Sequence, residues 1–183
     1  MAGRGLLQSA NLLGALALAV SDRLEASVEA TVGRSQSAAA MLSALDQFLD
    51  APGIERLAQV LGLSQSGAVR LVDRLERDGY VHRASGADGR SVAVHLTASG
   101  RRVARRVREQ RLALLDALMT CLSDDEREAF ASLAGRLLAG MMREPGARRW
   151  TCRLCDLDAC RRREGLCPVE QEARHRHGEP TDQ

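Results

Sequence analysis

Residues 54–79 read IERLAQVLGLSQSGAVRLVDRLERDG, and they predict two short helices joined by a tight turn. The first helix ends at Gly62, because glycine adopts the left-handed conformation of a helix C-terminus without steric cost. Ala58 is small enough to let a second helix approach closely. Ser64 provides an N-cap for that second helix, and Gly79 ends it. The pattern is therefore typical of a helix-turn-helix.

The second of these helices has one apolar and one polar face. Its apolar side chains recur at i, i+3, i+4 and i+7 and are expected to face a core: Ala68, Leu71, Val72 and Leu75. The polar face holds candidate DNA contacts: Ser64, Gln65, Ser66, Arg70, Arg74 and Arg77. Arginine binds guanine edges bidentately, glutamine can bind adenine, and serine can bind phosphate or base. Because Asp73, Glu76 and Asp78 also lie there, a solvated face with intrahelical ion pairs is the alternative.

A β-hairpin is predicted after this helix. Residues 80–84 and 91–96 alternate as strands do, with Val92, Val94 and Leu96 on one side of the second strand. Ser91, Ala93 and His95 lie on the other side. Residues 85–89, Ser-Gly-Ala-Asp-Gly, have the composition of a turn. This order of elements predicts a mainly α fold with a small hairpin wing, a winged helix-turn-helix.

Long helices are expected on both sides of this unit, over 8–31, 36–50, 97–122 and from 124 to the Glu144-Pro145-Gly146 break. The first is expected to be largely buried. In the third, Val107, Leu114 and Cys121 fall seven residues apart, which favours a dimer seam with Cys121 as a small core residue. Ser123 and Glu126 have the spacing of a capping box.

The segment from Asp88 to Gly100 resembles the wing of the MarR family of bacterial regulators. That wing reads roughly D-x-R-x5-L-T-x-x-G, and the matching residues here are Asp88, Arg90, Leu96, Thr97 and Gly100. Residues 63–81 are equally typical of the family's recognition segment, and the resemblance covers roughly residues 8–142.

The resemblance implies a homodimer that binds double-stranded DNA and regulates transcription. Residues 8–35 and 97–143 would form the dimerisation region, and 36–96 the DNA-binding domain. The recognition helix would enter the major groove of a pseudo-palindromic operator, and Arg90 would enter the minor groove beside Asp88. An ion pair of Arg90 with Asp88 or with an acid of the recognition helix is the alternative role. Many such proteins repress transcription until a small molecule or an oxidant changes the dimer.

Four of the five cysteines fall within residues 152–167, with the spacing C-x2-C-x4-C-x6-C. These are Cys152, Cys155, Cys160 and Cys167. Such crowding favours a metal or redox site in a reducing compartment over a disulfide framework. Zinc fits best, as a closed structural site within residues 150–170. An iron–sulfur cluster in a redox-sensing regulator is the alternative, since a proline follows the last cysteine. A dithiol switch is a third. Residues 171–183 are expected to be a flexible tail.

Composition limits the remaining classes of protein. The 183 residues are 45% hydrophobic but only 2% aromatic, which fits one domain with a small appendage and a core of Leu, Ala and Val. The net charge of +2 does not itself indicate nucleic acid, although all 26 basic residues are arginine. The N-terminal apolar run loosely resembles a signal peptide, but polar residues interrupt it, so a cytoplasmic protein without a membrane partner is expected.

We find no constellation that predicts an enzyme. The chain lacks a recognisable Ser/His/Asp set, a glycine-rich phosphate loop and paired acids in an evident cleft. A thioredoxin-like oxidoreductase would place its C-x-x-C beside a βαβ unit, and no such unit is predicted. The alternative function is a winged-helix protein-interaction module without DNA binding.

Overall fold

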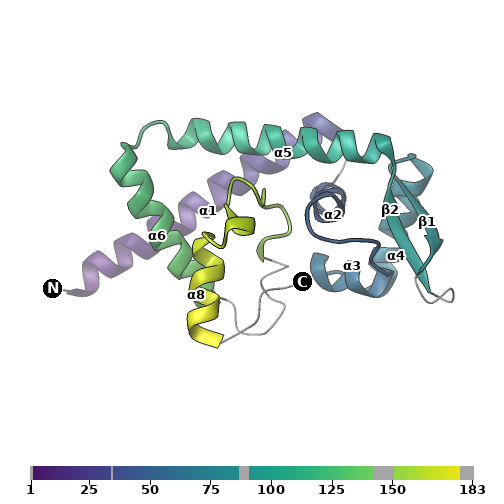
Figure 1. The fold of residues 1–183 in the computed structure, drawn as a ribbon. Helices are drawn as coiled ribbons and strands as arrows, with labels where there is room; N and C mark the ends of the chain where they lie inside the picture. Colours follow the sequence, from purple (N-terminus) through teal and green to yellow (C-terminus); the bar gives the residue numbers. More distant parts are fainter. Residues whose placement is uncertain (1, 34, 87–90, 142–150, 178–183) are drawn as a thin grey trace.

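The computed structural model describes residues 2–33, 35–86, 91–141 and 151–177 (Figure 1). The elements are α1 (Ala2–Val32), α2 (Gln36–Gln47), α3 (Ile54–Leu61), α4 (Gln65–Arg77), β1 (Val81–Ser85), β2 (Val92–Leu96), α5 (Ala98–Met119), α6 (Asp124–Met141), a 3-10 turn η1 (Arg162–Glu164) and α8 (Pro168–His177). The strands pair as an antiparallel hairpin. The predicted mainly α fold with a hairpin wing is confirmed.

One buried cluster holds α2, α3, α4, the hairpin and the start of α5 together. Met41, Leu42, Leu57 and Val94 are completely buried in it, each with 0% of its surface exposed. The predicted apolar face of α4 points into this core, because Ala68, Leu71, Val72 and Leu75 are all buried. Aliphatic side chains thus fix α4 with its other face outward.

The turn between α3 and α4 follows the predicted chemistry. Gly62 has φ of 61°, and its N–H donates to the carbonyls of the last turn of α3. Ser64 caps α4, its Oγ accepting a hydrogen bond of 3.1 Å from the N–H of Gly67. Gly79 has φ of 74° after the last turn of α4, so the chain can reverse into β1.

Thr97 and Gly100 join the hairpin to α5. The Oγ of Thr97 accepts from the N–H of Gly100 at 3.0 Å and donates to the carbonyl of Gly79 at 2.7 Å. A Cβ atom at Gly100 would clash with the carbonyl group of Tyr80. Close backbone packing therefore requires glycine at this position, and it fixes the base of the wing against α5.

The hairpin differs from expectation at its outer end. In the antiparallel pairing of β1 with β2, Val81 lies opposite Leu96 and Ser85 lies opposite Val92. Val94 and Leu96 are buried as predicted, whereas Val92 is 46% exposed because it lies beyond the core. Ala93, expected on the opposite side, is also buried, since the segment before α3 bridges to it.

The N-terminal helix is longer and more exposed than expected. α1 begins at Ala2 rather than residue 8, and its C-terminal part packs on α5 and α2 through Val28, which contacts Ala39 and Val107. The prediction that it is largely buried is wrong for the single chain. Its apolar side chains from Leu6 to Leu18 are 49–73% exposed: Leu6, Leu7, Leu12, Leu13, Leu16 and Leu18.

The α5–α6 turn confirms the capping box and corrects the role of Cys121. The N–H of Ser123 donates to Glu126 at 2.8 Å, and the N–H of Glu126 donates to Ser123 Oγ at 3.4 Å. Cys121 lies beyond the end of α5 and is exposed rather than buried. A heptad position only predicts burial while the helix continues, and α5 ends at Met119. The predicted end of α6 at residues 144–146 lies outside the described residues.

The C-terminal segment is ordered further than expected. Residues 168–177 form α8, so the prediction of a flexible tail from residue 171 is wrong for this part, and residues 178–183 lie outside the described range. α8 lies beside α6, at the opposite end of the molecule from the wing (Figure 1). Among the described residues, no helix is long and apolar enough to cross a membrane.

Candidate nucleic-acid interface

The outward face of α4 presents the predicted polar residues. All six are exposed: Ser64, Gln65, Ser66, Arg70, Arg74 and Arg77. At the start of the helix the hydroxyls of Ser64 and Ser66 lie 3.3 Å apart. Arg70 Nε donates to the Ser66 carbonyl at 3.3 Å, so this side chain lies along the helix. Three guanidinium groups and a polar N-terminus thus share one surface.

Both acids of α4, Asp73 and Glu76, are paired with Arg83, which sequence analysis missed. Arg83 Nη2 lies 2.6 Å from Asp73 Oδ1, and its Nη1 pairs with Glu76. The backbone N–H of Arg83 also donates to Glu76 Oε1 at 2.9 Å. That backbone bond, together with the Arg83 side chain, lowers the pKa of Glu76. Sequence analysis placed Arg83 in the predicted strand 80–84, but that position could not show which acids its side chain meets.

The Arg83 pairs change the charge of the interface. Asp73 and Glu76 share one guanidinium from β1, whereas the predicted alternative paired them within α4. The exposed arginines of α4 are consequently less compensated than the sequence of the helix suggests. The same contacts tie β1 to α4 and hold the wing in a fixed direction relative to the recognition helix.

A surface concavity of about 550 Å³ lies between α4 and the start of α2. Ser35 and Ser37 line it from the α2 side, and Arg70, Arg74 and Arg77 from the α4 side. Hydroxyls, guanidiniums and the N–H groups of a helix N-terminus are groups that bind phosphate. Sequence analysis did not assign Ser35 and Ser37 a role, although serine just before a helix was a usable signal.

The tip of the wing lies outside the described residues, and so do the predicted contacts Asp88 and Arg90. The N–H of Gly86 donates to the carbonyl of Ser91 at 2.8 Å and closes the hairpin at the base of this tip. Below it, the rings of His82 and His95 stack with centroids 5.3 Å apart.

The four clustered cysteines lie together at a different place. Side-chain hydrogen bonds join Cys152 to Cys155, Cys155 to Cys160, and Cys160 to Cys167. The bond with Cys152, with burial, raises the pKa of Cys155 to about 11. All are free thiols. Within the described ranges, no three or more His, Cys, Asp or Glu side chains already converge on one point as metal ligands do.

The chain is similar to known regulators. A family model described as MarR family matches residues 33–91. The HTH-type transcriptional regulator YfiV of Bacillus subtilis is 35% identical over 77 residues, which are 42% of this chain and 48% of YfiV, so the chain spans about half of that relative.

Solved structures share the fold over a longer stretch. A MarR family protein from Bacillus stearothermophilus has a TM-score of 0.68 at 25% identity, covering 77% of this chain and 98% of that one. Streptococcus pneumoniae FabT, solved in complex with DNA, has a TM-score of 0.63 at 17% identity, covering 72% of this chain and 94% of FabT. The family model thus covers the helix-turn-helix part of the chain, and the structural neighbours share its winged-helix fold.

Proposed function

We propose that the chain is a homodimeric transcriptional regulator that binds a pseudo-palindromic operator in double-stranded DNA. The observation that carries the proposal is the exposed face of α4, with Arg70, Arg74 and Arg77 outward while Arg83 pairs with the intervening acids. The family match over residues 33–91 supports it, because that range contains α2 to α4 and β1.

The arrangement suits entry into a major groove. Gln65 and Ser66 lie in the first turn of α4, the part of a recognition helix that meets base edges. The arginines further along the same face can bind guanine or flanking phosphates. The concavity beside Ser35 would receive one phosphate of the DNA backbone, which fixes the depth of α4 in the groove.

A second copy of this chain is the proposed occupant of the exposed apolar surface. The N-terminal part of α1 and the outer side of α6 bear large exposed apolar side chains. On α6 these are Phe130, Leu133, Leu137 and Met141. Exposed apolar surface on this scale marks an association site. Figure 1 shows both helices at the end of the molecule away from the wing, so pairing there leaves both copies of α4 open to DNA.

Repression is the proposed outcome of binding, since a dimer on promoter DNA excludes the transcription machinery. A small molecule or an oxidant that alters the α1–α6 pairing would change the spacing of the two recognition helices and release the DNA. This part of the proposal rests on the resemblance to the MarR family.

Selection from random duplex DNA followed by titration at fixed salt tests the function. We expect enriched sequences with two inverted half-sites about one helical turn, roughly 34–36 Å, apart. Arg70→Ala and Arg74→Ala should each weaken binding to that site by about 1–3 kcal/mol, or roughly 5- to 150-fold in Kd. Arg106→Ala, which removes an exposed arginine from α5, is the matched control and should change Kd little.

Two results would contradict the proposal. One is the absence of any enriched sequence, which would favour a winged-helix protein-interaction module. The other is an equal loss of affinity in all three variants, because a general effect of positive charge does not require α4 to be the recognition helix.

A further inference from the structure

Residues 151–167 fold as a compact knuckle held by local hydrogen bonds. The N–H of Cys155 donates to the carbonyl of Cys152 at 2.9 Å, which closes the first turn. Asp156 Oδ1 accepts from the N–H groups of Asp158 and Ala159 at 2.9 and 2.8 Å. Gly165, with φ of 73°, returns the chain toward Cys167 just before α8. These turns bring together four cysteines that lie within sixteen residues of sequence.

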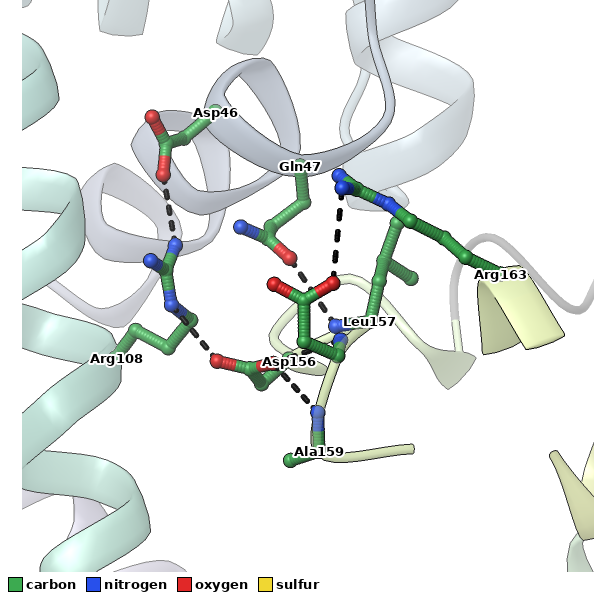
Figure 2. A network of polar contacts seen from close by, with 8 residues as sticks. Asp46, Gln47, Arg108, Asp156, Leu157, Ala159 and Arg163 are labelled. Carbon is green, nitrogen blue, oxygen red and sulfur yellow. Dashed lines mark hydrogen bonds and ion pairs between the residues drawn. The ribbon is translucent and has the colours of Figure 1, made fainter. Parts of the chain in front are cut away.

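One side of the knuckle is bound to α2 and α5 (Figure 2). Arg108 of α5 bridges Asp46 of α2 at 2.7 Å and Asp156 of the knuckle at 2.8 Å. The side-chain oxygen of Gln47 accepts from the N–H of Leu157 at 3.1 Å. Leu157 itself is buried. The knuckle is therefore attached to the winged-helix core by specific contacts.

Its other side is bound to α6. Cys167 and Cys160 pack with Leu138 and Ala139 of α6. A Cβ atom at Gly135 of α6 would come within 2.6 Å of the Pro168 side chain, so the start of α8 lies directly on that helix. The thiols thus sit at the junction between the winged-helix core and the α6–α8 pair.

Two arginines lie near the thiols, and one of them, Arg162, also pairs with the buried Glu170 at 3.1 Å. Arg111 of α5 acts electrostatically on Cys155 and Cys160, and its Nε is buried without a hydrogen-bond partner. Arg162 acts in the same way on Cys152. Four thiolates around a divalent ion carry a net charge of −2, and nearby guanidiniums would offset that charge.

We propose that Cys152, Cys155, Cys160 and Cys167 bind one zinc ion, which fastens the junction between the winged-helix core and the α6–α8 pair. Binding replaces four S–H bonds with four Zn–S bonds and releases the protons to solvent. Since the thiols are now linked in series and do not meet at one point, their side chains rotate inward when the ion binds.

The hydrogen bonds that join neighbouring thiols favour a single ion over an iron–sulfur cluster. Zn–S bonds of about 2.3 Å place the four sulfurs of a tetrahedral site roughly 3.8 Å apart. In a cluster the thiolates bind different iron atoms and stay farther apart. Neighbouring thiols within hydrogen-bonding reach therefore need less rearrangement to hold one ion.

The test uses the full chain, purified under reducing conditions and analysed for metals and acid-labile sulfide. We expect about one zinc per chain, and replacement by cobalt should give the visible absorption of a tetrahedral thiolate site. Cys155→Ser and Cys160→Ser should lose the bound ion and the cobalt spectrum. Cys121→Ser, which changes the exposed thiol outside the knuckle, should keep both.

If the serine variants do not fold, the proposal can still be tested on the wild-type protein. Removal of metal with a chelator should lower the Tm, and stoichiometric zinc should restore it. The proposal is overturned by a chain that binds no zinc or cobalt at stoichiometric concentration, by retention of metal in Cys155→Ser and Cys160→Ser, or by brown protein that contains iron and labile sulfide. DNA binding is measured separately, so loss of zinc with retained operator affinity leaves the proposed function intact.

Discussion

Replacing Arg108 with methionine should detach the cysteine knuckle from the winged-helix core. The guanidinium holds two carboxylates, Asp46 and Asp156, at 2.7 and 2.8 Å. The side chains are mostly buried, with 18%, 10% and 12% of their surfaces exposed for Arg108, Asp46 and Asp156. Methionine keeps much of the aliphatic volume but leaves both carboxylates without their shared cation.

The expected loss of stability lies between that of exposed and fully buried ion pairs. Exposed pairs contribute about 0.2–1 kcal/mol, whereas removing one partner of a buried pair costs about 3–5 kcal/mol. Because roughly a tenth of each carboxylate remains in contact with water, we expect a loss of about 3 kcal/mol. For a chain of this size that corresponds to a fall in Tm of roughly 6–12 °C.

Urea denaturation at one fixed protein concentration measures this loss, since association would make the apparent stability depend on concentration. The matched control is Arg106→Met, an exposed arginine on the same helix, which should lie within about 0.5 kcal/mol of wild type. A double-mutant cycle of Arg108→Met with Asp156→Asn isolates the bridge to the knuckle and should give a coupling of at least about 1 kcal/mol. A coupling near zero would refute the docking of the knuckle on α5.

Other predictions concern the wing, the interface charge and the dimer. Gly100→Ala should lower the free energy of unfolding by about 3 kcal/mol, because its Cβ clashes with Tyr80, and calorimetry against Gly14→Ala, whose Cβ meets nothing, checks this. Arg83→Met should destabilise the protein at neutral pH. The backbone N–H of residue 83, which the variant keeps, contributes most to lowering the pKa of Glu76 below 4.5, and the Arg83 side chain lowers it further. The side-chain part of the stabilisation is complete above pH 4.5 and disappears as the pH falls through the lowered pKa, so the denaturation curves of variant and wild type should converge in acid. Leu13→Asp should shift the dimer toward monomer in sedimentation experiments, and an unchanged dimer would move the interface away from α1.

The elements that sequence predicted correctly depend on local chemistry. Gly62 and Ser64 act on backbone groups within four residues, so their roles follow from the residues next to them in the sequence. The apolar face of α4 likewise follows from helical spacing. Its exposed residues were placed as expected, and their contacts with DNA stay a prediction.

The features that sequence could not predict depend on distant contacts. Arg83 meets Asp73 and Glu76 from another element, and the partner of Arg108 on α2 is 62 residues away. Nothing in the local pattern selects these acids among many. The apolar residues of α1 show a different limit, because the same periodicity can serve a core within one chain or the interface proposed between two chains.

The hydrogen bond between Gln47 and Leu157 joins residues 110 positions apart. At translation rates of about 5–20 residues per second, Gln47 leaves the ribosome roughly 5–20 s before its partner. The winged-helix core must hold its shape through that interval, and its buried cluster is built almost wholly from residues before α6. Closing so long a loop is entropically slow, so the knuckle should dock as a late and separate step of folding. A newly made chain would thus have a formed recognition helix before its C-terminal junction closes.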